Sequence, residues 1–202
     1  VHWRPDAAAK RVDLDALSPE EVASWQAGDR LLLKGTMLTG RDAAHKRIKD
    51  MLGRGEDMPV SFEGRAIYYV GPVDPVLGEV VGPAGPTTAT RMDAFTEMML
   101  SLGLLAMIGK AERGQSAVRA IARHKVAYLM AVGGAAYLVA RAIRQARVVA
   151  FEDLGMEAIH EFTVEDMPVT VAVDSRGNNV HTLAPAEWRE KIAREGLLQS
   201  AS

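Results

Sequence analysis

The sequence contains no cysteine among its 202 residues. This absence excludes disulfides and also excludes any zinc ion or iron–sulfur cluster held by thiolates of this chain. A chain without disulfides is compatible with a reducing compartment, and we expect a cytoplasmic protein. The five histidines do not show the spacing of a metal site, so we predict that this chain holds no metal.

The sequence also has no large excess of one charge. It contains 24 Lys and Arg and 26 Asp and Glu, which gives a net charge of −2. Binding to nucleic acid depends on attraction to phosphates, so we predict no nucleic-acid partner. The longest uncharged run, 126–140, is shorter than the roughly 20 residues of a membrane helix, and we expect no membrane partner. The chain begins at Val1 without an apolar leader, and we interpret it as cut or processed from a longer product.

Nucleotide-binding motifs are also missing. The glycines form neither a Walker A motif nor a Gly-x-Gly-x-x-Gly sequence, which argues against an NTPase and a dinucleotide enzyme. A hydrophobic fraction of 48% instead predicts one globular domain over residues 1–202, with 1–17 as a linker leading into it.

Alternating strand and helix patterns through the middle of the chain favour an α/β fold, and a more antiparallel last third predicts a mixed sheet. A capping box at Ser18 predicts a helix start. In the last third we expect a pair of strands over 158–162 and 167–173. A short strand near Val180 and a final helix from Pro185 are predicted to follow.

The most distinctive segment, 81–93, reads VGPAGPTTATRMD. Its two Gly-Pro steps predict a rigid turn, because proline fixes φ and glycine permits positive φ. If a helix begins at Thr87 or Thr88, then Thr87 and Arg91 share one face. A hydroxyl, free N–H groups and a guanidinium would then suit a carboxylate or a phosphate. An ordinary loop with a threonine cap is the alternative.

Two further cations stand at predicted element ends. Arg41 begins a predicted helix, where the dipole disfavours a cation, so we expect an anion beside it, either Asp42, another protein carboxylate or a ligand. Lys110 follows an apolar strand, and ligands bind at strand ends in α/β sheets, although a lysine extending to solvent is an equal alternative. Together Arg41, Arg91 and Lys110 would form a cationic pocket for a dicarboxylate. Small residues at 132–136 favour close packing.

In this order the segments resemble the C-terminal domain of class I fumarate hydratases, the iron–sulfur fumarases, and the related β subunit of tartrate dehydratase. One such motif is weak evidence, but six in sequence are specific, and the resemblance covers about residues 12–192. The matching segments are 37–47, 68–72, 81–93, 107–110, 131–137 and 153–158.

The resemblance implies a swivelling β/β/α domain that forms one half of a reversible hydro-lyase. In that family a partner, either an N-terminal domain or an α subunit, binds a [4Fe–4S] cluster with three cysteines and leaves one iron open to the substrate as a Lewis acid. This chain would hold no part of the cluster. A four-carbon dicarboxylate substrate and a homodimer are implied as well.

Residue roles also follow from the resemblance. Arg41, Arg91 and Lys110 resemble the residues that bind the substrate carboxylates. Thr87 resembles the proposed base that removes a proton from the carbon next to a carboxylate. Threonine alone is a poor base, so it would need a carboxylate of the partner and the field of nearby cations. The alternatives are a β subunit of L-tartrate dehydratase and a non-catalytic dimerisation or closure domain.

Overall fold

The structure is a computed structural model, and it describes residues 7–75, 79–131 and 136–183, without the side chains of 136–138. The predicted final helix from Pro185 and the glycines of the 132–136 segment lie outside the described residues.

Seven strands form one mixed sheet, which confirms the predicted fold class. Their bounds in chain order are β1 (Lys10–Asp13), β2 (Arg30–Thr39), β3 (Ala66–Tyr68), β4 (Ala106–Gly109), β5 (Ala127–Ala131), β6 (Ile143–Ala150) and β7 (Ile159–Val173). Strands β2 to β5 run parallel to one another, and β7 pairs antiparallel with both β5 and β2. The sheet thereby closes into a five-stranded barrel, to which β1 and β6 add at β2 and β7.

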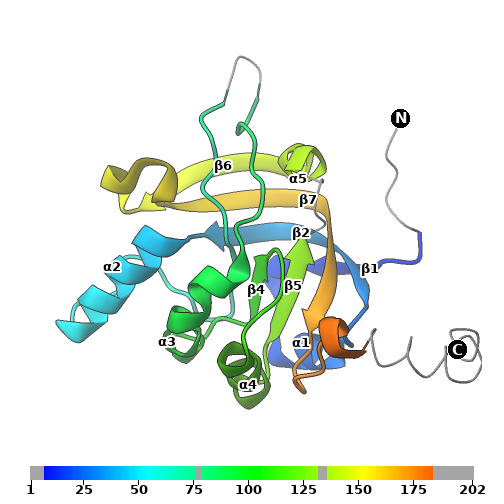
Figure 1. Cartoon of the computed structure of the whole chain (residues 1–202). Helices are drawn as coiled ribbons and strands as arrows, with labels where there is room; N and C mark the ends of the chain where they lie inside the picture. The colour runs from blue at the N-terminus through cyan, green and yellow to red at the C-terminus, as the bar shows by residue number, and fades with distance from the viewer. Residues whose placement is uncertain (1–6, 76–78, 132–135, 184–202) are drawn as a thin grey trace, which may run out of the picture.

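Helices α2, α3 and α4 lie together on one side of this barrel (Figure 1). The predicted helix start is confirmed, because Ser18 is the N-cap of α1 and its hydroxyl accepts a hydrogen bond from Glu21 N at 3.2 Å. The α-helices are α1 (Pro19–Ser24), α2 (Asp42–Gly53), α3 (Thr96–Ser101), α4 (Gln115–His124) and α5 (Ala136–Ala142), and three 3₁₀ helices are η1 (Leu14–Ala16), η2 (Ala89–Phe95) and η3 (Glu152–Glu157).

The expected pair of strands in the last third is wrong, because one strand, β7, runs through both segments. Strand β2 is ten residues long and pairs with β7 from Glu161 to Thr170, with a register shift between Val164 and Met167, where Asp166 has a φ of 55°. This bulge bends the strand and does not end it. The strand expected near Val180 is also wrong. Asn179 makes an isolated bridge to Val173, and residues 180–183 are helical.

Two apolar clusters fill the molecule. One joins β1 and α1 to alternate strand residues such as Leu31, Leu33 and Phe162. The other lies between the sheet and helices α2 to α4, and includes Ile48 and Ile121. This two-sided burial explains the near-continuous hydrophobic runs of the parallel strands.

The Gly- and Pro-rich segment after β3 leaves the barrel as a long arm (Figure 1). Its two legs pair with each other, since Gly82 N donates to Val73 O at 2.9 Å and Val73 N donates to Pro83 O at 3.3 Å. The buried Tyr68 hydroxyl also donates to Ala84 O at 2.6 Å. These bonds return the chain to the barrel at Thr87.

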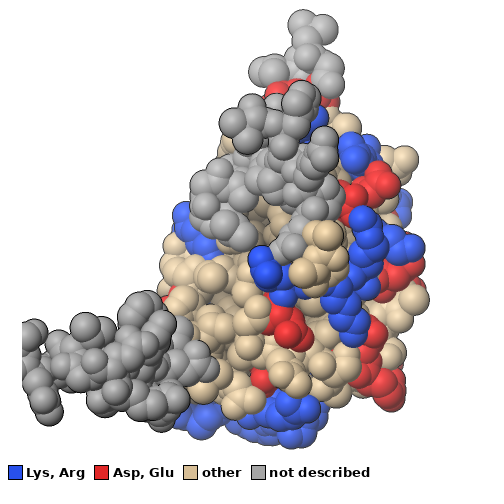
Figure 2. Space-filling model, turned by 90° about the vertical axis from the view of Figure 1, so that its right-hand side faces the viewer, with Lys and Arg blue, Asp and Glu red and all other residues tan. Residues whose placement is uncertain are grey.

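On the face shown in Figure 2, basic and acidic side chains lie interspersed. None of the helices in the described ranges has the length and apolar character needed to cross a membrane.

Candidate active site

The ends of the parallel strands β2, β3 and β4 meet at one edge of the barrel. Gly40 N, just after β2, donates to Tyr68 O at 3.1 Å, and Tyr69 N, just after β3, donates to Ile108 O at 2.8 Å. Polar residues that follow these strands are therefore placed side by side, where α/β sheets bind ligands.

Thr87 lies between the ends of β3 and β4. Its N–H donates to Tyr69 O at 2.7 Å, and its C=O accepts from Lys110 N at 3.1 Å. Glycine at position 109 permits this close approach, because a Cβ there would lie 3.0 Å from the Tyr69 ring and 3.1 Å from Ala89 Cβ. Backbone hydrogen bonds thus hold Thr87 and Lys110 next to each other.

Both of these residues have side-chain groups without an internal partner. Thr87 is 8% exposed, and its hydroxyl makes no hydrogen bond to any residue that the structure describes. The Lys110 side chain is exposed and forms no ion pair within the described part of the chain. A hydroxyl and an ammonium group are therefore available to a ligand at this edge.

Arg91 does not share a helical face with Thr87, contrary to the prediction. The 3₁₀ helix η2 begins only at Ala89, with Thr88 as its N-cap, and Thr87 precedes it in a strand-like position. The Arg91 side chain is 55% exposed, and its Nη2 lies 2.6 Å from Asp42 Oδ2. Because Asp42 begins α2, this ion pair still brings Arg91 to the end of β2.

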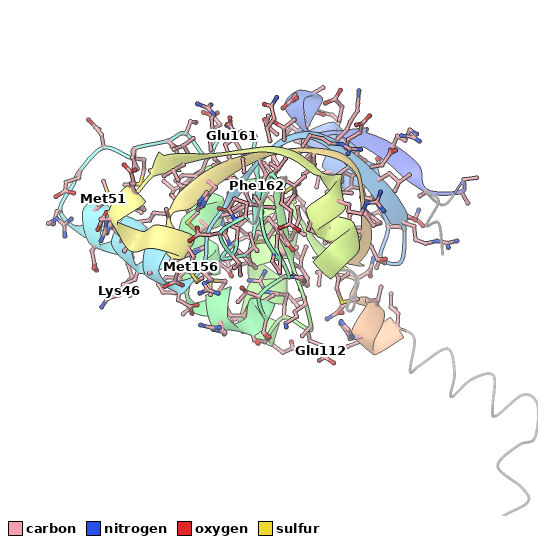
Figure 3. The ribbon with its side chains drawn as sticks, turned by 90° about the horizontal axis from the view of Figure 1, so that it is seen from above. Lys46, Met51, Glu112, Met156, Glu161 and Phe162 are labelled. Atoms are coloured by element: carbon pink, nitrogen blue, oxygen red, sulfur yellow. The ribbon has the colours of Figure 1, made fainter. Side chains whose placement is uncertain are left out.

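Arg41 is the N-cap of α2 and has the anion that the sequence led us to expect. Its Nε donates to Glu157 Oε1 at 2.7 Å, and its Nη2 faces Met156 Sδ at 3.6 Å. The guanidinium lies so close to Gly71 that a Cβ there would be 2.7 Å from its Cζ. Figure 3 shows Met156 beside the helix α2 that carries Lys46. The anion is thus a carboxylate of η3 rather than Asp42.

The two arginines are therefore both ion-paired within the chain, but the pairs differ in exposure. Arg91 and Asp42 are 55% and 37% exposed, whereas Arg41 and Glu157 are 25% and 27% exposed. An exposed pair contributes little in water, so Arg91 can exchange Asp42 for a ligand carboxylate at small cost. Glu157 instead takes the Nε of Arg41 and does not occupy its Nη1.

His45, one turn after Arg41 in α2, is a residue that the sequence reasoning did not select. It is 1% exposed, and its Nδ1 lies 2.8 Å from Arg41 O, so the Nδ1–H donates to that carbonyl. Its Nε2 is buried and has no hydrogen-bond partner among the described residues. Burial lowers the pKa of His45 to about 4. The imidazole of His45 is therefore neutral and packs in the first turn of α2. Only the four-residue spacing of Arg41 and His45 in the sequence could have predicted the hydrogen bond between them.

Two surface hollows lie away from this edge. One of about 500 Å³ follows the outer face of α2, and one of about 420 Å³ lies beside β6. Neither is lined by Thr87 or by the three predicted cations.

The side chains that the structure describes do not form a site for a metal ion or an iron–sulfur cluster. Across the described ranges, no three His, Cys, Asp or Glu side chains come together, and the sequence has no thiolate to offer. The arrangement can hold a ligand with two anionic ends and can place a hydroxyl beside it.

The chain is similar to one protein-family model and to several known proteins. A family model described as Fumarase C-terminus matches residues 2–184. The chain is 37% identical over 179 residues to "Fumarate hydratase class I, aerobic" of Salmonella typhimurium, an alignment that covers 86% of this chain and 31% of that protein. It is 36% identical over 179 residues to "Fumarate hydratase class I, anaerobic" of Escherichia coli, covering 86% and 33%.

A shorter relative is matched along nearly its whole length. The chain is 32% identical over 182 residues to "Putative L(+)-tartrate dehydratase subunit beta" of Methanocaldococcus jannaschii, covering 87% of this chain and 93% of that protein. By contrast, the chain spans about a third of the length of the two hydratases.

Proposed function

The chain belongs to the fumarase C-terminus family, and from this premise we propose that it is the C-terminal part of a class I fumarate hydratase. The reaction is the reversible hydration of fumarate to (S)-malate. The observation that carries the proposal is the cationic edge. There Arg41 and Lys110 follow the ends of β2 and β4, and Thr87 is hydrogen-bonded through its backbone between the ends of β3 and β4. Arg91 is held at the same edge by its ion pair with Asp42, at the start of α2. The hydratases named above support it.

The three cations are proposed to bind the two carboxylates of the substrate. An arginine presents a planar fork that matches a carboxylate with two hydrogen bonds, whereas Lys110 acts as a point charge. Arg91 gives up its exposed pair with Asp42 when the substrate binds. Two charged ends held in this way fix the carbon chain of the substrate against Thr87.

Thr87 is proposed to move the proton. In dehydration its oxygen takes a proton from the carbon next to a carboxylate, and in hydration it returns that proton. A neutral hydroxyl is a poor base, so a carboxylate of the partner must first accept the hydroxyl proton. The surrounding cations then stabilise the oxyanion of Thr87.

The [4Fe–4S] cluster of this family is proposed to belong to a partner, either an N-terminal domain or an α subunit. It would supply Lewis-acid chemistry to the substrate. This chain has no cysteine with which to bind a cluster, so its own proposed part is to bind the substrate and to move the proton. Assembly as a homodimer and a cytoplasmic location are further parts of the proposal.

A second candidate is the β subunit of an L-tartrate dehydratase. The observation that favours it is the match along 93% of a relative with that name. Malate and tartrate share four carbons and two carboxylates and differ by one hydroxyl, so the cationic edge suits both. A non-catalytic closure or dimerisation domain is the remaining alternative.

Turnover by the assembled protein tests these candidates. The chain is combined with its cluster-bearing partner under anaerobic conditions and supplied with (S)-malate or with L-tartrate, and product is followed by ultraviolet absorbance. We expect turnover of malate by the assembly and none by this chain alone. Turnover of tartrate only would favour the second candidate, and a cluster-loaded assembly that is indifferent to Arg41→Ala, Thr87→Val and Lys110→Ala would identify a closure domain.

A further inference from the structure

One fully buried cation, Arg113, lies behind the cationic edge. Its guanidinium is 0% exposed, and its Nε lies 2.6 Å from Asp93 Oδ1. Its Nη2 donates to Thr96 Oγ1, and its Nη1 faces Met107 Sδ at 3.7 Å. All three guanidinium nitrogens therefore have partners within the chain.

Two tyrosine rings complete the surroundings of this guanidinium. Its Cζ lies 5.6 Å from the ring centroid of Tyr69 and 5.0 Å from that of Tyr128. Both distances fall within the range of cation–π attraction, which is strongest where water is excluded. The cation is thus stacked against aromatic side chains from the end of β3 and from β5.

The carboxylate partner of Arg113 connects two of the predicted site segments. Asp93 lies two residues after Arg91 in η2. Its second oxygen, Oδ2, accepts a hydrogen bond from Gly114 N at 2.7 Å. Asp93 therefore ties the helix of Arg91 to the loop that follows Lys110.

The two tyrosines connect to the remaining site residues. The carbonyl of Tyr69 accepts the 2.7 Å hydrogen bond from Thr87 N. The hydroxyl of Tyr128 donates to Ala111 O at 2.9 Å, beside Lys110. Ala111 has a φ of 62°, a left-handed conformation that a non-glycine residue keeps only where its surroundings impose it.

These contacts make Arg113 the common point of the segments that carry Thr87, Arg91 and Lys110. Burial of an ion pair is expensive, and an apolar pair of similar volume is often equally stabilising. Stability alone therefore does not explain a charged pair at this place. We propose that Arg113 is a positioning residue, which fixes Thr87, Arg91 and Lys110 relative to one another, and this role rests on the function proposed above.

A double variant separates positioning from folding. Arg113→Met with Asp93→Asn removes both buried charges, and methionine fills the space between the two tyrosines. The new asparagine keeps an oxygen that can accept from Gly114 N. Arg113→Met alone leaves the Asp93 carboxylate without its partner and is expected to be less stable, so it is not the deciding variant.

In the assembled enzyme we expect the double variant to melt close to the wild-type temperature and to lose about 10²-fold in kcat/KM for malate, the order of loss that a displacement near 1 Å can cause. Both kcat and KM should change, because the base and the carboxylate-binding cations move relative to each other. Arg113→Lys keeps the charge but not the fork, so it should recover part of the rate. A stable double variant with wild-type kcat and KM would overturn the proposal.

A control is the half-buried pair of Arg65 and Glu161, whose side chains are 27% and 17% exposed. The Glu161 carboxylate also accepts from the exposed Arg147. Arg65 precedes β3, at the opposite end of that strand from Tyr69. The double variant Arg65→Met with Glu161→Gln should keep the wild-type kcat and KM.

Amide hydrogen exchange distinguishes failure of this proposal from failure of the proposed function. If Arg113 positions these segments, exchange in 87–95 and 110–114 should rise at least about 10-fold in the Arg113→Met, Asp93→Asn variant and stay unchanged in β2 and β7. This measurement does not require turnover, so an inactive wild-type assembly would refute only the proposed hydratase activity and not the positioning role of Arg113. Unchanged exchange in both segments would refute the positioning role, whatever the activity.

Discussion

Acidification should weaken this fold through His45. The imidazole is 1% exposed, its Nδ1–H donates to Arg41 O, and its Nε2 is buried without a partner among the described residues. Burial lowers the pKa of His45 from 6.5 to about 4. The folded chain therefore keeps this ring neutral at a pH where the unfolded chain binds a proton.

The size of the effect follows from the two pKa values. Between pH 6.5 and pH 4 the unfolded state binds more protons, so the free energy of unfolding falls as the pH is lowered through this window. Proton linkage gives a loss of roughly 2 kcal/mol from His45 between pH 7.5 and pH 5. His45→Gln removes the titrating ring and keeps an N–H donor. Between pH 7.5 and pH 5, the free energy of unfolding of this variant should therefore fall by roughly 2 kcal/mol less than that of the wild type.

Urea unfolding at pH 7.5 and pH 5 measures this difference. The burial of His160 also lowers its pKa, so part of the pH dependence should remain in His45→Gln. Ile48→Val, a core change in the same helix, serves as the control and should lower stability by about 1 kcal/mol at both pH values. Equal losses on acidification in wild type and His45→Gln would refute the reasoning.

Two further predictions concern the charges and the cofactor. In the assembled enzyme, Arg91→Ala should cost on the order of 2–5 kcal/mol in kcat/KM for malate, because a substrate carboxylate loses its partner. Arg91→Lys should recover part of that loss, and a near-normal Arg91→Ala enzyme would contradict the assignment. This chain alone, reconstituted anaerobically with iron and sulfide, should bind no stoichiometric cluster because it lacks thiolates, and iron and sulfide analysis would reveal one if it formed.

The sequence predicted those features that depend on residues close to one another in the chain. The start of α1 follows from Ser18 as N-cap and Pro19 at the first helical position. Lys110 directly follows β4, as the apolar run before it in the sequence predicted. The anion beside Arg41 was also expected, because a cation at a helix start is unfavourable without one.

Long-range contacts account for what the sequence did not predict. The continuity of β7 depends on pairing with β2, more than a hundred residues earlier. The partner of Arg41 proved to be Glu157, which neighbours it only in the folded chain. Arg113 belongs to no local pattern, and its importance emerges only when Asp93 and two distant tyrosines surround it.

The central claim is that this chain supplies the proton-transferring hydroxyl of a hydratase, and Thr87→Val tests it most directly. Valine keeps the shape of threonine and removes the hydroxyl, so folding should survive. With Thr88→Val as the neighbouring control, the assembled enzyme is incubated with malate in heavy water, and exchange of the substrate C–H proton is followed by NMR. We expect Thr87→Val to slow turnover and exchange by about 10²-fold or more, as loss of a general base does, with little change in substrate affinity. A larger loss of turnover and exchange in Thr88→Val would identify Thr88 as the base instead. Undiminished exchange in both variants would contradict the claim.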